Sequence, residues 1–437
     1  MNTMNTTVSI KEELAALIGI DWASQQHALC LYDCATAQRE ASTLAHTPEA
    51  IAHWAQGLEQ RFAGKKIALC LEQTRGPLMN ALLEYPFFVL YPINPATAAR
   101  YRQAFKTSRA KDDPSDAQVC LEVVLHHREK LTPWLAQDAP TRELSRLLEA
   151  RRTVVDLRTL LTNMLRDALK NYYPQALELA GQDLFAPLGC QFLLRWPSLQ
   201  ELQKARPESV RKFYYAHNCR RMDVMEKRLN AIAQMLPLCR DATVLEPAVV
   251  QVKMLARQLL QLSAALKEYD TRIAQLFAKH SDASIWESFP GAGPTLAPRL
   301  ACAFGTQRSR YESAIAIQQY SGVAPVQEKS GKKQHWIHRR WARPHFIHQS
   351  FFEYAGQSVL HCDWAKRFVQ EQRARGKTYS TAVRALAFKW QRIMFVCWRD
   401  RLPYDQTTYL QSLKRRGSHL AHNLNRELPK AACKSYQ

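Results

Sequence analysis

The N-terminal third of the sequence alternates short apolar runs with helix-starting signals, and this order restricts the fold more than any other feature. Apolar runs occupy residues 17–21, 27–32, 65–71 and 87–91. Between the second and third runs, Thr47 and Pro48 mark a helix start, because Thr is a favoured N-cap and Pro fits the first helical position. Two or three strands followed by an alternation of helix and strand predict an α/β sheet with a central parallel portion.

Two acidic residues, Asp21 and Glu72, each stand at the end of a predicted apolar strand. In an α/β sheet, ligands collect at the carboxyl ends of the strands. The sequence therefore predicts that both carboxylates lie at one edge of the sheet, where a ligand can reach them.

A third acidic stretch, at residues 111–117, contains Asp112, Asp113 and Asp116. Pro114 fits the first turn of a helix, and the apolar-periodic run that follows predicts a helix starting near it. Asp113 and Asp116 are three residues apart and so share one face of that helix. They form either a solvated acidic helix start, favoured by the helix dipole, or part of a site for a divalent cation.

Taken together, these carboxylates are predicted to form one site. Its members are Asp21, Glu72, Asp113 and Asp116. Four acidic side chains in one cleft can hold two cations roughly 3.5–4 Å apart, an arrangement suited to phosphodiester displacement. We therefore predict magnesium or another divalent metal as the cofactor.

The charge of the chain indicates a nucleic-acid partner. The formal net charge is +21, and residues 281–437 carry 25 Lys and Arg against 10 Asp and Glu. Such a concentration is typical of nucleic-acid-binding proteins, whereas a basic membrane-surface protein needs an amphipathic anchor or lipidation signal, and we find neither. Eleven scattered cysteines, no signal peptide and no apolar run near 20 residues predict a cytoplasmic protein outside the membrane.

Two long helical patterns follow, at residues 139–173 and 250–279. In the second, apolar residues recur every seven positions over 252–273 and again over 255–276. This is the a/d spacing of a coiled coil. It predicts either pairing between subunits or the packing of two core helices within one chain.

The C-terminal part carries two features that could contact phosphate. A Pro-Gly-Ala-Gly-Pro turn containing Gly291 and Gly293 precedes a predicted helix, and it is either an ordinary turn or one that holds a phosphate on its backbone N–H groups. Ser330 lies in a cationic loop and is either an unremarkable surface serine or a nucleophile whose attack on phosphorus the nearby charge stabilises. The basic residues expected to bind nucleic acid are Lys329, Lys332, Lys333, Arg339, Arg340 and Arg343.

In their order along the chain, these motifs resemble those of the DEDD transposases of bacterial insertion sequences. This is the one-ten family of bridge-RNA-guided serine recombinases, to which the Piv invertases are related. The acidic set matches at residues 18–21, at residues 71–74 and in the Lys-x-Asp-x-x-Asp-Ala motif of residues 111–117. The C-terminal family domain matches at residues 290–294, at residues 321–325 and at Ser330-Gly331, the position of the family's nucleophilic serine.

The resemblance implies the domain organisation of that family. An RNase H-like (RuvC-like) catalytic domain is expected at residues 1–135 and a helical, coiled-coil region at 136–280. A mostly helical, basic transposase domain with the serine is expected at 281–360, followed by a basic extension at 361–437. Two positions depart from the family pattern: Asp112 replaces the usual Thr, and a Gly-Asn-like turn is replaced by residues 340–344.

The resemblance also implies a site-specific DNA recombinase. Ser330 would attack a phosphate polarised by metal on the four carboxylates, giving a phosphoserine intermediate. A noncoding guide RNA would pair with donor and target DNA, and a dimer or tetramer at the nucleoid would complete the active site. One alternative is a RuvC-like nuclease that uses water as the nucleophile. The other is an inactive nucleic-acid-binding protein, and the intact acidic set argues against it.

Overall fold

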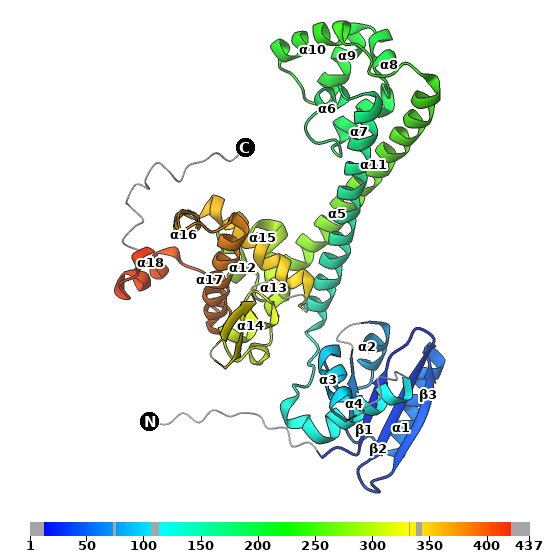
Figure 1. Cartoon of the computed structure of the whole chain (residues 1–437), viewed down its shortest axis with the longest axis vertical. Helices are drawn as coiled ribbons and strands as arrows, with labels where there is room; N and C mark the ends of the chain where they lie inside the picture. The colour runs from blue at the N-terminus through cyan, green and yellow to red at the C-terminus, as the bar shows by residue number, and fades with distance from the viewer. Residues whose placement is uncertain (1–12, 73–75, 106–112, 332, 338–342, 421–437) are drawn as a thin grey trace. The chain divides into compact units, whose positions relative to one another are not determined.

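The chain folds into two compact units, residues 1–136 and 137–437 (Figure 1). The structure, a computed structural model, describes residues 13–72, 76–105, 113–331, 333–337 and 343–420. Each unit has buried apolar clusters of its own. None of the described helices is long and apolar enough to cross a membrane.

The first unit is built on a five-stranded mixed sheet with the order β3-β2-β1-β4-β5. The strands are β1 (Ala16–Asp21), β2 (Gln26–Asp33), β3 (Arg39–Ala45), β4 (Ile67–Leu71) and β5 (Phe88–Pro92). β2 pairs antiparallel with both β1 and β3, whereas β4 pairs parallel with both β1 and β5. The predicted α/β sheet with a parallel portion is therefore confirmed, but that portion extends from the middle strand β1 to the edge strand β5, and β3 completes the antiparallel part.

Helices cover both faces of this sheet. They are α1 (Pro48–Arg61), α2 (Pro77–Leu82), α3 (Pro95–Phe105) and α4 (Asp113–His127). Ile18 and Ile20 of β1 share an apolar cluster with α1 and α2, whereas Leu17 shares another with α3 and α4. Because successive side chains of a strand point to opposite faces, β1 is apolar along its length and buried on both sides.

The second unit is organised around two long helices, α5 (Ala139–Tyr172) and α11 (Ala242–Ala278), which pack along each other. Val252, Leu259 and Ile273 of the predicted seven-residue seam are at most 2% exposed within the single chain. The seam thus packs two core helices inside one chain, which is one of the two arrangements that its spacing predicts.

Each end of the helix pair carries a cluster of further elements. One end holds α6 (Ala176–Leu179), α7 (Pro187–Arg195), α8 (Leu199–Lys204), α9 (Pro207–Ala216) and α10 (Met222–Gln234). The other end holds α12 (Ala283–Glu287), α13 (Gly293–Phe304), α14 (Ala314–Tyr320), the hairpin of β6 (Val326–Ser330) and β7 (Lys333–Ile337), α15 (His345–His361), α16 (Asp363–Ala374), α17 (Tyr379–Asp400) and α18 (Gln406–Arg415). A single apolar core extends from α12 to residue 420, so it continues across residue 360 without a break.

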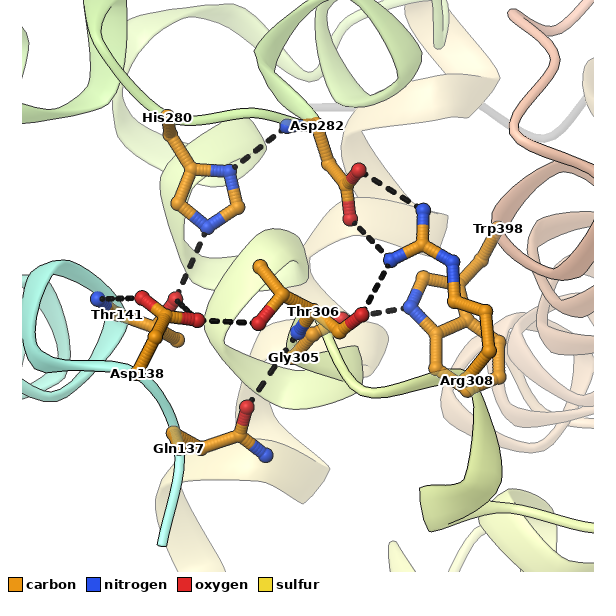
Figure 2. A network of polar contacts seen from close by, with 9 residues as sticks. All are labelled: Gln137, Asp138, Thr141, His280, Asp282, Gly305, Thr306, Arg308 and Trp398. Carbon is orange, nitrogen blue, oxygen red and sulfur yellow. Dashed lines mark hydrogen bonds and ion pairs between the residues drawn. The ribbon is translucent and has the colours of Figure 1, made fainter.

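A polar network joins the start of α5 to the end of α11 (Figure 2). Asp138 caps α5 by accepting a hydrogen bond from the Thr141 amide (2.9 Å) and also accepts one from the Thr141 hydroxyl (2.9 Å). The Thr306 hydroxyl, in the loop after α13, donates to the same carboxylate. His280 accepts from the Asp282 amide through Nδ1 (3.1 Å), so its Nε2 carries the proton and donates to Thr141 Oγ1 (3.2 Å).

The network ends at the guanidinium of Arg308, which contacts both Asp282 and Trp398. Arg308 donates to both oxygens of Asp282 at 2.7 and 2.8 Å and lies over the ring of Trp398, 5.2 Å from its centroid. The indole of Trp398 donates to the Gly305 carbonyl at 2.6 Å. The ends of both long helices are therefore fixed to the loop after α13 by side chains that are far apart in the sequence (Figure 2).

Candidate active site and nucleic-acid interface

Asp21 and Glu72 lie at adjacent strand ends in the first unit. The parallel register pairs Ile20 of β1 with Leu71 of β4, so Asp21 and Glu72 are the next residues along the two strands. Both side chains are half-buried and both have interaction partners. The fold thus brings these two carboxylates to the carboxyl edge of the parallel part of the sheet, where α/β folds bind their ligands.

Helix α4 approaches this edge unusually closely. A Cβ added to Gly19 would lie 2.1 Å from the carbonyl oxygen of Ala117 and 2.3 Å from the amide nitrogen of Leu121. Only glycine allows this contact between helix and strand backbones. Since side chains two positions apart share a face of a strand, Asp21 projects to the face that Gly19 presents to α4.

A buried thiol on α4 lies within the electrostatic field of both carboxylates. A hydrogen bond to Cys70 and burial raise the pKa of the Cys120 thiol, and the negative charges of Glu72 and Asp21 raise it further. Cys70 is on β4, two residues before Glu72, and Cys120 is four residues after Asp116. The two strand-end carboxylates and the first turns of α4 therefore belong to one region of the unit.

The last two predicted carboxylates lie at the start of α4. Asp116 is 3% exposed and forms an ion pair with Arg102 of α3. Asp113 is the first residue of α4, and its side chain lies outside the description. Among the side chains that the structure does describe, no three Asp, Glu, His or Cys residues come together as a metal-binding group.

The strand-end pair by itself fits a divalent cation. Magnesium in proteins is commonly held by one or two carboxylates together with water molecules and the phosphate oxygens of a substrate. Asp21 and Glu72 supply two such carboxylates at an edge suited to ligands. The ion pair with Arg102 engages one oxygen of Asp116 and leaves the other as the atom that could join them.

Ser330 lies at the tip of the β6–β7 hairpin in the second unit. It is the last residue of β6 and pairs with Lys333, the first residue of β7. The intervening Gly331 has a φ of +57°, in the left-handed region that favours glycine, and a Cβ built on it would meet no atom within 4 Å apart from its chain neighbours. The side chains of Ser330 and Lys333 lie outside the description, whereas that of Lys329 is exposed.

The segment that leads into this hairpin packs against Arg343, two residues before α15, and against His348 of α15. A Cβ on Gly322 would lie 2.8 Å from side-chain carbons of Arg343, so the Arg343 side chain covers this turn. His348 donates from Nδ1 to the carbonyl oxygen of Ser321 at 3.1 Å. Burial, and then the positive charge of Arg343, lower the pKa of His348 to about 4, so the ring is neutral near pH 7.

The remaining predicted nucleic-acid contacts are only partly described. Gly291 and Gly293 both have positive φ, and Gly293 begins α13. A Cβ on Gly291 would lie 2.7 Å from the His361 ring, so this turn packs on α15, whereas open space surrounds Gly293. Lys332, Arg339 and Arg340 lie outside the described residues, as does Asp112.

Sequence reasoning missed the residues that support these sites. Arg102, Cys120 and His348 contact the predicted residues or their neighbours, and none of them stands in a recognisable motif. Each contacts a residue on another element, so no local spacing could have identified it. The one local signal was Gly19, because glycine within an apolar strand indicates the close approach of another backbone.

Two separate segments of the chain match family models of transposases. Residues 18–174 match a family model described as a transposase, the DEDD transposase domain of IS110 elements. Residues 283–370 match the transposase family of IS116, IS110 and IS902. These two matches give the class of the matched segments: one is similar to the DEDD domain of IS110 transposases and the other to the transposases of IS116, IS110 and IS902.

Individual relatives agree with this assignment. The chain is 27% identical over 413 residues to the protein assigned as transposase of the IS117 mini-circle of Streptomyces coelicolor, covering 91% of this chain and 97% of that protein. It is 25% identical over 316 residues to a protein of insertion element IS110 from the same organism, covering 71% and 76% of the two chains. The chain is therefore a homologue of the IS117 transposase, and the matches support function as an insertion-sequence transposase, which acts on DNA.

Proposed function

We propose that this transposase is a DNA recombinase whose two units each supply one part of the active site. The first unit contributes Asp21 and Glu72, with Asp113 and Asp116 at the start of α4; the second contributes Ser330. The observation that carries the proposal is the parallel register that sets Asp21 beside Glu72 on the face covered by α4. A divalent cation bound there would supply Lewis-acid polarisation of the scissile phosphate.

The reaction proposed for the chain's own residues is a phosphoryl transfer to serine. The Ser330 hydroxyl loses its proton and attacks phosphorus, the bond from phosphorus to the 3′-oxygen breaks, and that oxygen takes up a proton. The products are a phosphoserine linkage and a free 3′-hydroxyl, which can later attack the phosphoserine of another strand. The energy of the phosphodiester bond is kept in the covalent intermediate, so the exchange needs no nucleotide cofactor.

A serine hydroxyl is a poor nucleophile at neutral pH and needs activation by a base or a metal. The carboxylates proposed for that role are in the first unit, so the two units must meet during the reaction, within one chain or between subunits of an oligomer. We further propose that a noncoding guide RNA selects the donor and target DNA, as the family resemblance implies. A nuclease that uses water remains the competing mechanism.

Trapping of the covalent intermediate tests the proposal. A substrate with a nick near the scissile phosphate would hold the phosphoserine adduct, which is counted after denaturation. Ser330→Ala should lose the adduct and recombination while keeping metal binding and nucleic-acid affinity. Lys329→Ala, one residue away and exposed, should weaken binding yet retain the adduct at saturating DNA.

The acidic site is tested with a matched pair of charge removals. Glu72→Gln should abolish cleavage, whereas Glu59→Gln on the exposed side of α1 removes the same charge and should leave cleavage intact. An adduct formed by Ser330→Ala would assign the nucleophile to another residue, such as Ser321, whereas unimpaired strand cleavage by it without an adduct would favour the water mechanism. Full cleavage by Glu72→Gln would remove that residue from the site.

A further inference from the structure

Two histidines lie at the strand end that carries Asp21, on the opposite face of the sheet. His27 begins the buried part of β2 and shares a face with Leu29 and Leu31, which pack against α1 and α2. His46 follows the end of β3, and its amide donates to the Gln25 carbonyl at 2.7 Å. The imidazole of His27 is fully buried. A polar ring on an otherwise apolar face needs hydrogen-bond partners, and these partners indicate which part of the backbone the ring stabilises.

The partners of His27 fix the backbone just after Asp21. Ala23 lies two residues beyond the end of β1, and its amide donates to Nδ1 of His27 at 3.2 Å. Because Nδ1 accepts, the neutral ring carries its proton on Nε2, which donates to Nδ1 of His46 at 3.0 Å. Burial, together with the charge that His46 can carry, lowers the pKa of His27 to about 4, so the ring is neutral near pH 7.

The intervening Trp22 is held by the same pair of rings. Its indole stacks on His27, with centroids 6.4 Å apart and planes at 27°, and meets His46 edge-on at 6.5 Å. Asp21 is paired with Ala28 in the ladder on one side, and the residues that follow it are held by His27. The carboxylate is therefore attached to a backbone that is fixed both before and after it.

We propose that His27, supported by His46, is a positioning residue for the Asp21 carboxylate. It acts by holding the Trp22–Ala23 turn, so that Asp21 keeps the geometry a divalent cation requires beside Glu72. This inference rests on the proposed function of the carboxylate edge. Groups that orient metal ligands without touching the metal typically change metal affinity by 10–100-fold when removed.

The test compares substitutions that differ in one hydrogen bond. The oxygen of an Asn side chain can occupy the place of Nδ1, so His27→Asn keeps an acceptor for the Ala23 amide. A Gln side chain reaches the place of Nε2 instead, so His27→Gln keeps the contact with His46 and loses that with Ala23. Manganese binding to the full chain, measured by electron paramagnetic resonance, should weaken about tenfold or more in His27→Gln and His27→Leu. In His27→Asn it should stay within about threefold of the wild-type value.

Two controls separate the possible failures. Leu58→Ala removes a buried side chain of α1 away from this edge, so it should lower the melting temperature of the first unit and leave manganese affinity unchanged. Asp21→Asn should remove the binding itself. Equal affinities in His27→Gln and His27→Asn would overturn the positioning role, and so would wild-type affinity in His27→Gln. Unchanged manganese binding in Asp21→Asn would instead refute the proposed carboxylate site.

Discussion

The network at the base of the long helix pair gives a prediction whose size can be worked out from its contacts. Asp138 performs two tasks at once: it caps α5 through the Thr141 amide, and it accepts a hydrogen bond from Thr306 in a loop more than 160 residues away. Loss of an N-cap costs about 1 kcal/mol. Loss of a hydrogen bond to a charged group costs about 1.5–3 kcal/mol, and we take the lower part because Asp138 is half-buried. Asp138→Ala should therefore destabilise the second unit by about 2–3 kcal/mol.

The partner helix provides a matched control. Asp241 caps α11 in the same way, accepting from the Thr243 amide at 2.9 Å and from the Thr243 hydroxyl at 2.7 Å, and it is exposed. Asp241→Ala should lose the cap alone, or about 1 kcal/mol. The excess in Asp138→Ala then measures the tertiary contact with Thr306.

The assay is urea unfolding of the full chain, followed through the fluorescence of the buried tryptophans of the second unit. A double-mutant cycle of Asp138→Ala with Thr306→Val should give a coupling energy of about 1 kcal/mol or more between the two side chains. Equal losses in Asp138→Ala and Asp241→Ala, together with zero coupling, would refute the reasoning, because the contact with Thr306 would then contribute nothing.

Three further predictions concern the cores and the pH response. Gly19→Ala should destabilise the first unit by at least about 1–3 kcal/mol in calorimetry, because the added Cβ would overlap the α4 backbone. The control is Gly57→Ala on α1, where an added Cβ has open space, and this change should stabilise the first unit by about 0.5–1 kcal/mol. Leu259→Ala, in the buried seam, should cost about 2–5 kcal/mol in urea unfolding, and a loss below 1 kcal/mol would mean that the seam is not packed within the chain. Burial lowers the pKa of His280 against the opposing pull of Asp282 and Asp138, so the unfolded chain binds this proton more readily and stability should fall as pH drops below about 6.5. His280→Gln should reduce that slope in the transition of the second unit, and an unchanged slope would contradict the assignment of a buried neutral ring.

Asp138 contributes to the pH response as well. Burial by itself would raise the pKa of this carboxyl, but hydrogen bonds from Thr306 and Thr141 outweigh burial and hold its pKa below the usual value. Its contribution to stability is therefore present above the unfolded pKa near 3.8 and is lost as pH falls below that value. Both residues therefore make the folded state less stable as the pH falls, His280 at mildly acidic pH and Asp138 at strongly acidic pH.

The sequence by itself determined the elements that local chemistry specifies. The apolar runs predicted the strands on either side of Asp21 and Glu72, and Thr47 with Pro48 predicted the start of α1, where the Thr47 hydroxyl accepts from the Ala50 amide at 3.2 Å. The seven-residue spacing predicted a buried seam on α11. These features follow from side-chain period and capping preferences, which act over a few residues.

Only the tertiary structure decided which surfaces those elements meet. The seam at Leu259 has the same spacing whether its partner is another subunit or α5, and packing within the chain resolved the choice in favour of α5. The tertiary structure likewise decided that Asp116 pairs with Arg102 and that His27 contacts Ala23. In each case the partner is fixed by strand register and helix packing, which depend on the whole unit. The spacing of residues along the chain specifies a face, and only the packed core specifies what that face touches.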